Sequence, residues 1–266
     1  MNRDKLLGFA RNPEDRLMLS RLADKLVQAQ RASRVTWSTF LDPRQREMAE
    51  AALDAVLEED DVSVRIDGGY EGAERVLVGF VPEVGWEVDD NPPIVLVQAR
   101  TSGRGDGKPL THRDWLGSLM GLGLKRETIG DILVMPEGAD LLMLADVGRI
   151  VISQLAQVGA ERVTLTQAEP DAIRVPERGT REIRATVMSL RLDAVAAAAF
   201  SVSRSRMADW IRAEKVSLNW EVQTSPAAIV KPGSTLSLRG KGRAVLAEVG
   251  VVSRKGRTGI VLQRLT

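Results

Sequence analysis

Short strand-forming segments alternate with helix-forming segments between residues 62 and 170, and this alternation constrains the fold more than any other feature of the chain. The predicted strands cover residues 62–66, 75–81, 94–100, 131–135, 141–145 and 162–166. The predicted helices cover residues 113–122 and 147–158. Strands that alternate with helices form layered folds in which helices cover a face of a sheet. We therefore predict an α+β fold whose middle domain, residues 61–170, is an α/β sandwich with both helices on one face of its sheet.

The order of these segments narrows the topology of the middle domain. From the strand at 75–81 onward, the succession strand, strand, helix, strand, strand, helix, strand is similar to the split βαβ plait of RRM-like RNA-binding modules. Topology by itself carries no function. The order therefore predicts a plait-like, RRM-like shape and not a ligand.

An N-terminal helical region, residues 1–60, precedes this domain. An apolar stripe at helical spacing contains Leu17, Leu19, Leu22, Leu26 and Val27. Asp42 and Pro43 are typical of a helix start, with Asp as the N-cap and Pro at the first helical position. A second helix is therefore predicted to begin at residue 43.

A linker over residues 171–182 separates the middle domain from the last part of the chain. Pro170, Pro176 and Gly179 lie among charged residues there, and such a composition favours a linker.

The last part of the chain, residues 183–266, begins with two predicted helices. Residues 193–200 are Ala-rich and strongly helical, and Ser203 is the expected N-cap of a second helix over residues 204–213. Short alternating strands follow, so we predict a small domain that combines a helix pair with a small β-sheet.

The charges of the chain are distributed unevenly. Residues 174–266 contain 17 Lys and Arg against 7 Asp and Glu, whereas the remainder contains 20 basic and 29 acidic side chains. The whole-chain net charge of +1 hides this division. A basic segment of this kind is typical of a surface that binds a polyanion.

The composition excludes several classes of protein. Cysteine is absent, so disulfides and thiolate metal sites are excluded, and a reducing compartment is expected. The N-terminus is charged throughout and lacks the apolar core of a signal peptide, and the longest apolar runs are too short to span a bilayer. We therefore expect a soluble protein of the cytoplasm or the plastid stroma, without a membrane partner.

One sequence motif lies inside the basic segment. Its parts are Arg191-Leu192-Asp193, Ser203-Arg204, Ile211, Val216-Ser217-Leu218-Asn219, Pro226 and Lys231-Pro232-Gly233. This pattern resembles the S4 domain, the RNA-binding domain named after a protein of the small ribosomal subunit. The resemblance implies a short helix pair and a small twisted sheet that together form an L-shaped basic surface.

The resemblance and the local charge indicate which side chains contact RNA. The planar donors of arginine suit phosphate oxygens, and basic turns inside a basic domain favour phosphate contacts. The RNA-binding residues predicted in this domain are Arg191, Ser203, Arg204, Arg206, Lys215, Asn219, Lys231, Arg239, Lys241 and Arg243.

Two positions depart from the S4 pattern. Trp220 follows Asn219 where the family usually has Gly, and Ser234 stands where it usually has Asp. The first departure changes the turn and offers a ring for stacking, and the second removes an acidic group beside the predicted binding face. Neither departure removes a basic residue, so the S4 interpretation stands.

A second resemblance extends over nearly the whole chain. Residues 110–123, 125–127 and 129–132, with the sequences LTHRDWLGSLMGLG, KRE and IGDI, are similar to the middle domain of the YlmH-like family. Cyanobacterial and plastid members of that family are labelled photosystem II S4 domain proteins. In this family an N-terminal helical region and a plait-like RNA-binding domain precede a C-terminal S4 domain. The resemblance implies binding to rRNA or tRNA on the large ribosomal subunit, in the handling of stalled subunits, without catalysis.

In the middle domain, His112, Arg113, Lys125 and Arg126 are the residues predicted to contact RNA. His112 has a second interpretation as the cap of the helix that follows it. The sequence His112-Arg113-Asp114 also resembles a kinase catalytic loop, but Leu119 stands where that loop needs Asn, and the sequence Asp-Phe-Gly does not occur.

Other glycine-rich or basic stretches keep two interpretations each. The loop at 101–108 is either a plain surface loop or a loop that becomes ordered on RNA. The basic turns at 239–243 and 254–257 are either solvated hairpin tips or phosphate contacts, and we favour phosphate contacts. Close helix packing and a helix C-cap are favoured over a phosphate cradle for Gly117, Gly121 and Gly123.

Two rival functions remain beside the non-enzymatic one. S4 domains are also attached to pseudouridine synthases, tyrosyl-tRNA synthetases and rRNA methyltransferases, so an RNA-modifying enzyme is an alternative. The middle segment is short and shows no clear catalytic motif of those enzymes. The family label also suggests a translation-linked assembly factor for photosystem II. We predict a non-enzymatic RNA-binding protein in translation quality control, with no cofactor and no small-molecule substrate.

Overall fold

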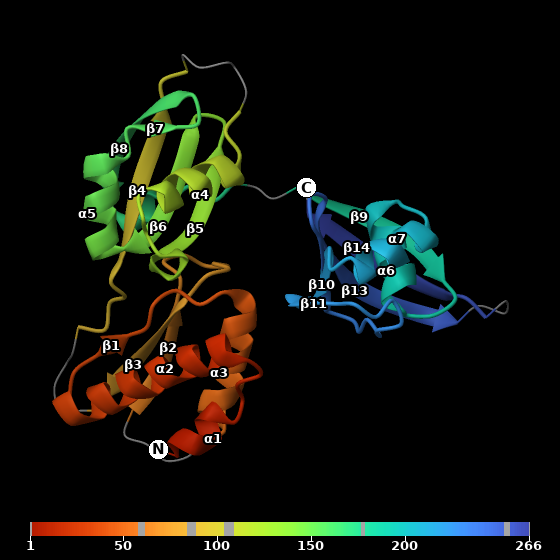
Figure 1. Ribbon diagram of the computed structural model, residues 1–266, viewed down its shortest axis with the longest axis horizontal. Coiled ribbons are helices and arrows are strands. Elements are labelled where there is room, and N and C mark those ends of the chain that lie inside the picture. The colour runs from red at the N-terminus through yellow and green to blue at the C-terminus, as the bar shows by residue number, and fades with distance from the viewer. Residues whose placement is uncertain are drawn as a thin grey trace. The chain divides into compact units, whose positions relative to one another are not determined.

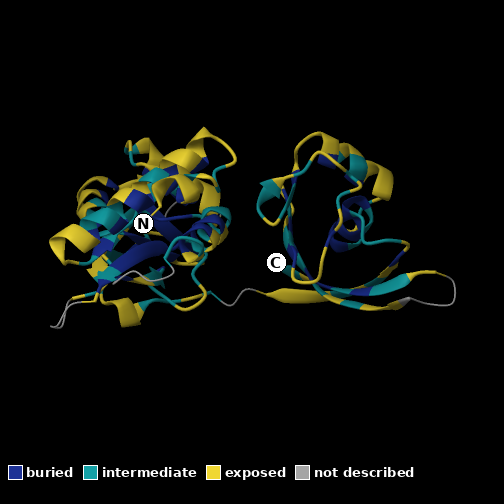
Figure 2. Cartoon of the chain, turned by 90° about the horizontal axis from the view of Figure 1, so that it is seen from below, coloured by how far each residue is buried: buried dark blue, intermediate teal, exposed yellow. Residues whose placement is uncertain are grey.

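The computed structural model of the chain describes residues 2–57, 62–83, 89–103, 109–176, 179–252 and 256–265. The chain separates into two units, which we call unit 1 (Met1–Pro176) and the C-terminal unit (Glu177–Thr266) (Figure 1). Each unit has its own hydrophobic core, and Figure 2 marks the buried residues of both units in dark blue. Most of the glycine-rich loop at 101–108, with its two interpretations, and part of the basic turn at 254–257 lie outside the described residues.

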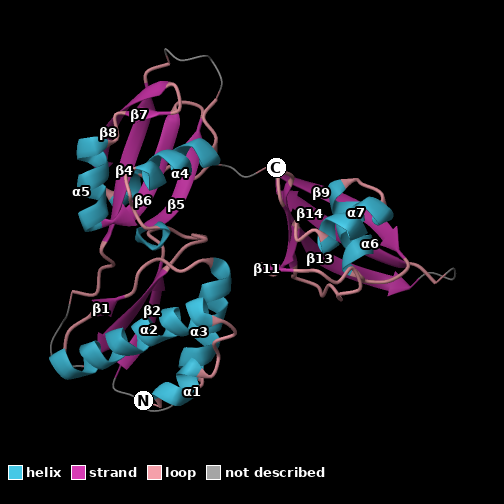
Figure 3. Ribbon diagram, viewed as in Figure 1, coloured by secondary structure: helices cyan, strands magenta, loops and turns pink. Residues whose placement is uncertain are grey.

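The first part of unit 1 packs helices against a small antiparallel sheet. Its elements are α1 (Arg3–Leu7), α2 (Pro13–Ala32), β1 (Thr36–Trp37), α3 (Pro43–Asp54), β2 (Val62–Asp67) and β3 (Leu77–Pro82). The Asp42 side chain accepts a hydrogen bond from the backbone N–H of Gln45, and Pro43 follows it, so the predicted helix start is confirmed. Leu19, Leu22 and Phe80 lie in the core between the helices and the sheet, and Figure 3 shows α2 across the strands.

Strands β2 and β3 occupy nearly the predicted residues, but they belong to a different sheet from the one predicted. The strand order is β1–β3–β2, and Thr36 pairs with Phe80. The prediction that these strands begin the plait-like sheet is therefore wrong. The physical reason is that Val62, Val78 and Phe80 bury their side chains against the N-terminal helices.

The second part of unit 1 is the predicted plait. Its elements are β4 (Ile94–Thr101), α4 (His112–Gly121), the short 3-10 helix η1 (Arg126–Thr128), β5 (Ile129–Met135), β6 (Gly138–Leu144), α5 (Ala145–Gln154), β7 (Gln157–Val158) and β8 (Glu161–Ala168). The strands are antiparallel in the order β5–β6–β4–β8–β7, which is the split βαβ arrangement. Trp115 of α4 and Val151 of α5 share one core with Val97 and Leu141, so both helices cover the same face of the sheet (Figure 1).

The chain that leaves β8 crosses the other face of this sheet. After the short 3-10 helix η2 (Pro170–Ala172), the backbone N–H of Arg174 donates to Asp140 Oδ2 at 2.8 Å. The side-chain amide of Gln98 donates to the Ala172 carbonyl at 3.0 Å. Gln98 and Asp140 are paired neighbours on β4 and β6 and face away from the helices. The outer face of the plait is therefore partly covered by the protein's own chain.

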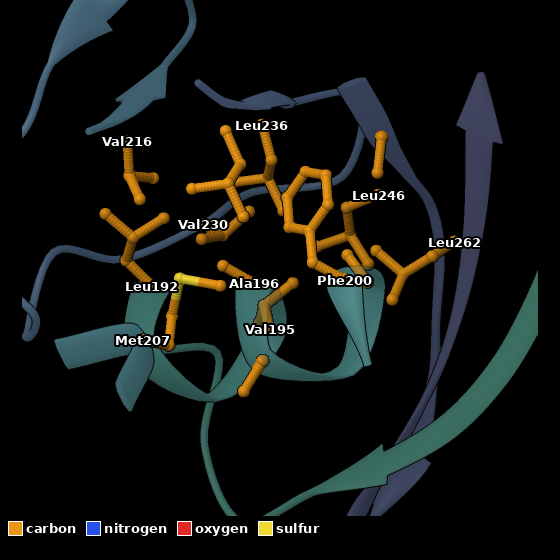
Figure 4. Packing of buried hydrophobic residues seen from close by; sticks show 14 of the residues in the cluster. Leu192, Val195, Ala196, Phe200, Met207, Val216, Val230, Leu236, Leu246 and Leu262 are labelled. Atoms are coloured by element: carbon orange, nitrogen blue, oxygen red, sulfur yellow. The ribbon is translucent and has the colours of Figure 1, made fainter. Parts of the chain in front are cut away.

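The C-terminal unit consists of a helix pair packed against one antiparallel sheet. Its elements are β9 (Thr180–Val187), α6 (Leu192–Phe200), α7 (Arg204–Arg212), β10 (Val216–Leu218), β11 (Glu221–Val222), β12 (Thr235–Leu238), β13 (Gly242–Val252) and β14 (Thr258–Leu265). The strand order is β11–β10–β12–β13–β14–β9. Figure 4 shows Val195 and Phe200 of α6 packed with Leu236, Leu246 and Leu262 of the sheet.

The ends of the predicted linker are structured. Strand β9 pairs with β14 from Thr180 onward, so the C-terminal sheet begins inside the predicted linker at 171–182. Arg174 is bound to the plait at the other end. Within the described part of the chain, none of the helices is both long and apolar enough to cross a membrane.

Candidate nucleic-acid interface

Helix α7 places basic side chains on the surface of the C-terminal unit. Ser203 caps the helix by accepting a hydrogen bond from the backbone N–H of Arg206 at 3.3 Å. Met207 and Ile211 face the core, so Arg204 and Arg206 are left exposed. The Arg206 guanidinium lies 4.8 Å from the centre of the Trp210 ring, and this cation–π contact restricts its orientation.

Arg191 and Arg204 converge on one buried carboxylate. Nη2 of Arg191 lies 3.0 Å from Asp193 Oδ2, and Nη2 of Arg204 lies 3.1 Å from Asp193 Oδ1. Burial disfavours the charged form of Asp193, but hydrogen bonds from the two arginines outweigh it, so the pKa of Asp193 lies below its ordinary value. The arginine side chains remain 37% and 50% exposed. Asp193 therefore holds two predicted RNA-binding arginines side by side while solvent still reaches them.

A shallow hollow on the sheet is lined by more of the predicted basic residues. The backbone N–H of Arg239 donates to the Lys215 carbonyl at 3.0 Å, which places these residues next to each other. Arg243 lines the same hollow, together with Ser217 and Ser237. Ser237 pairs with both Ser217 and Arg243, so these three side chains form a row on one face of β10, β12 and β13. The structure thus brings Lys215, Arg239 and Arg243 together.

The turn residue Asn219 has a structural role. Its backbone N–H donates to the Thr235 carbonyl at 2.8 Å, and its Oδ1 accepts from the Thr235 N–H at 2.9 Å. These bonds fix the turn between β10 and β11 against β12. An RNA contact of Asn219 stays a prediction.

The predicted lysines lie in exposed turns. The backbone N–H of Lys231 donates to Ser234 Oγ at 3.2 Å. Ser234, which stands where the S4 pattern usually has Asp, therefore stabilises this turn. Lys241 lies between Gly240 and Gly242, whose φ angles of 78° and 86° suit glycine. Both lysine side chains are exposed.

Helix α4 of the plait begins with a capping box. The backbone N–H of Asp114 donates to Thr111 Oγ1 at 3.4 Å, and the Thr111 N–H donates to Asp114 Oδ2 at 2.8 Å. Backbone and side-chain hydrogen bonds from Thr111 lower the pKa of Asp114. The cap is therefore Thr111, and the interpretation of His112 as the cap is wrong. His112 and Arg113 are exposed on the first turn.

Arg126 has an internal role that the sequence did not indicate. Its Nη1 donates to the Ile129 carbonyl at 2.6 Å and to the Gly130 carbonyl at 3.3 Å. Burial, with a smaller contribution from the neighbouring Arg75, lowers the pKa of Arg126 to about 10. These contacts brace the start of β5. Lys125 beside it is exposed, so it is the better placed of the two for RNA.

The glycines near the end of α4 have different roles. Apart from the neighbouring residues and backbone of α4 itself, a Cβ atom at Gly117 or Gly121 would meet no described atom within 4 Å, so the close-packing interpretation is wrong for both. Gly123 has a φ of 78° and directly follows Leu122, the C-cap residue of α4, so it is the left-handed glycine that ends the helix, as the capping interpretation predicts.

The fold and the basic surface define a class of protein: an RNA-binding protein with a plait-like domain followed by a C-terminal S4 domain. Residues 190–236 match the family model described as "S4 domain", and residues 108–171 match the one described as "Putative RNA-binding domain in YlmH". Over 240 residues the chain is 32% identical to "Ribosome-associated protein quality control protein P2" of Bacillus subtilis (strain 168), and the match covers 90% of each chain. The chain therefore belongs to the YlmH family.

A solved structure supports the fold. The chain titled "Cell division protein ylmH from Streptococcus pneumoniae" matches with a TM-score of 0.51 and 18% sequence identity. The match covers 62% of this chain and 98% of that chain.

Proposed function

We propose that this protein associates with ribosomes, binds the backbone phosphates of rRNA or tRNA through its S4 domain, and acts without catalysis. The observation that carries the proposal is the convergence of Arg191 and Arg204 on Asp193, in the same small domain as the hollow lined by Lys215, Arg239 and Arg243. Exposed guanidinium groups held side by side are suited to phosphate oxygens.

The setting of this activity is inferred from the Bacillus relative, whose name places it in ribosome-associated protein quality control. The similarity covers 90% of both chains, so it includes both units and not the S4 domain alone. We place the contact on the large ribosomal subunit and the protein in the cytoplasm, where translation occurs. Both matching family models describe RNA-binding or S4 domains, which supports a non-catalytic role.

We assign the plait a second, weaker RNA contact. Its outer sheet face is partly covered by residues 170–174, so the contact would not use the sheet surface on which RRM domains stack bases. The exposed side chains of Arg113, at the start of α4, and Lys125, beyond its end, offer cations for this contact instead. Two linked contacts raise the affinity through effective concentration.

Charge reversal tests the S4 contact. The variant Lys215→Glu/Arg239→Glu/Lys241→Glu should bind purified large ribosomal subunits about a hundredfold more weakly, because each lost phosphate contact removes counterion release. These side chains are exposed, so the fold should survive. The affinity of the parent should fall linearly with salt on logarithmic axes, and the variant should have a smaller slope.

A matched control reverses three exposed cations of unit 1, in Arg16→Glu/Arg31→Glu/Arg34→Glu. This control changes the net charge equally and should lose much less affinity. If both triple variants lost the same affinity for large ribosomal subunits, binding would depend on net charge alone, and this result would contradict the proposed surface.

The absence of catalysis has its own test. RNA from the bound subunits, incubated with the protein and a methyl donor, should yield the same nucleosides by mass spectrometry as RNA incubated without it. A new methylated nucleoside or an increase in pseudouridine would revive the enzyme alternative.

A further inference from the structure

The turn between β10 and β11 holds a bulky residue in a backbone conformation that rarely accepts one. Leu218 pairs with Glu221, so Asn219 and Trp220 are the two residues of the turn, with φ angles of 48° and 67°. Two-residue hairpin turns with positive φ at both positions prefer Asn followed by Gly, because glycine has no Cβ to clash. Tryptophan at the second position is strained, and strain of this kind is found at functional sites.

The surroundings of the turn suggest what the strain achieves. The Arg243 guanidinium lies 5.0 Å from the centre of the Trp220 ring, and Arg243 also lines the hollow that contains Lys215 and Arg239. The hydrogen bonds of Asn219 to Thr235 hold the turn in place. The indole is therefore positioned beside the basic hollow before any ligand arrives.

Packing alone does not explain the residue. Trp220 is only half-buried, and it is not among the described side chains that pack on the core of the C-terminal unit. Trp210 offers a contrast in the same domain. It also stacks with an arginine, Arg206, but it packs against the core from an ordinary helix. Trp210 therefore contributes to the core from an unstrained helix, whereas the Trp220 ring lies at the surface on a strained backbone.

We propose that Trp220 is a base-stacking residue. An unpaired RNA base would stack on the indole and extend the Arg243–Trp220 stack, while Lys215 and Arg239 hold the neighbouring phosphates. This inference rests on the proposed function and adds that the S4 domain binds RNA at an unpaired nucleotide. Every base offers a π face, so stacking selects unpaired over paired RNA and not a particular sequence.

The test compares two substitutions in the full chain. Trp220→Gly removes the ring and the strain, whereas Trp220→Phe keeps an aromatic ring. The probes are a fluorescently labelled RNA hairpin with an unpaired loop and a blunt duplex with the sequence of its stem. Trp220→Gly should bind the hairpin about tenfold more weakly, since the loss of one base–aromatic stack weakens binding by a factor of this order, and should bind the duplex as the parent does. Trp220→Phe should keep most of the hairpin affinity.

Thermal unfolding distinguishes binding from stability. Because glycine is relaxed at this φ, Trp220→Gly should unfold at the same temperature as the parent or higher. A lower unfolding temperature, or equal losses for hairpin and duplex, would assign Trp220 to the stability of the turn and overturn the stacking role.

The remaining outcomes separate this inference from the proposed function. If Trp220→Gly binds the hairpin as well as the parent while Lys215→Glu/Arg239→Glu/Lys241→Glu binds it weakly, stacking is wrong and phosphate binding stands. If neither variant loses affinity, this surface does not bind RNA and both proposals fail.

Discussion

At the scale of single residues, Asp193 links the stability of the S4 domain to its basic surface. Its side chain is 7% exposed and pairs with Arg191 and Arg204, which remain accessible to solvent. A buried carboxylate needs such partners, because an unpaired charge in the interior is strongly unfavourable. The same pairs orient two arginines for phosphate. One residue thus serves both the core of the domain and its surface.

The native Asp193 should make the free energy of unfolding depend on pH in a defined direction, and its replacement by Asn should remove this dependence. The folded-state pKa of Asp193 lies below the ordinary value of 3.8 for an aspartate side chain. The stabilisation is therefore present above the unfolded-state pKa and is lost as the pH falls through the folded-state pKa. Asp193→Asn should lower the free energy of unfolding by about 1–2 kcal/mol at neutral pH, and the difference from the parent should shrink towards pH ~3. Urea unfolding at both pH values measures it.

The matched control for this prediction is Asp209→Asn. Asp209 pairs with Arg212 on α7, but its side chain is 73% exposed, so this variant should unfold like the parent. A difference between Asp193→Asn and the parent that is equally large at both pH values would contradict the ionic origin of the stabilisation.

At the scale of elements, one buried carboxylate joins the two sheets of unit 1. Asp131 of β5 accepts hydrogen bonds from Tyr70 OH at 2.7 Å and from the backbone N–H groups of Glu74 and Arg75 at 2.7 and 3.1 Å. The donors come from the connection between β2 and β3. Asp131 therefore holds the N-terminal sheet to the plait.

Removal of the Asp131 carboxylate should weaken the attachment of the N-terminal sheet to the plait. Asp131→Ala deprives Glu74 and Arg75 N–H groups of this acceptor and should lower the free energy of unfolding by about 2–3 kcal/mol. Asp131→Asn keeps one side-chain oxygen and should lose less. Amide hydrogen exchange should accelerate at Glu74 and Arg75 in the Ala variant. Unchanged exchange there would show that the two sheets are held together by other contacts.

Helix starts could be predicted from the sequence, whereas strand pairing between distant segments could not. Local patterns were sufficient for the helix starts at Pro43 and Arg204, since caps depend on neighbouring residues. The partner of β3 was missed, because pairing Thr36 with Phe80 depends on burial that is distant in sequence. The cap at Thr111 could have been found, since Thr followed three residues later by an acid is a known start pattern. The anchoring of Arg126 could not, because its acceptors are backbone carbonyls.

At the scale of the whole molecule, the charge division follows the division into units. The junction at Pro176 lies close to residue 174, where the basic segment begins. Each unit has its own buried core, so each is expected to fold alone. A polyanion attracts the basic unit and repels the acidic one, which favours an approach in which the S4 domain makes the first contact.

Separating the units tests whether the plait adds to binding. A fragment of residues 179–266 should bind large ribosomal subunits with nearly the salt slope of the full chain, because the S4 domain makes most of the phosphate contacts. Its affinity should be about tenfold lower, because the linked second contact of the plait is lost. In the full chain, Arg113→Glu/Lys125→Glu should reproduce that loss without changing the fold, since both side chains are exposed. Equal affinities of fragment and full chain in a titration with labelled subunits would confine RNA binding to the S4 domain. The acidic unit would then serve to orient the protein or to contact another protein.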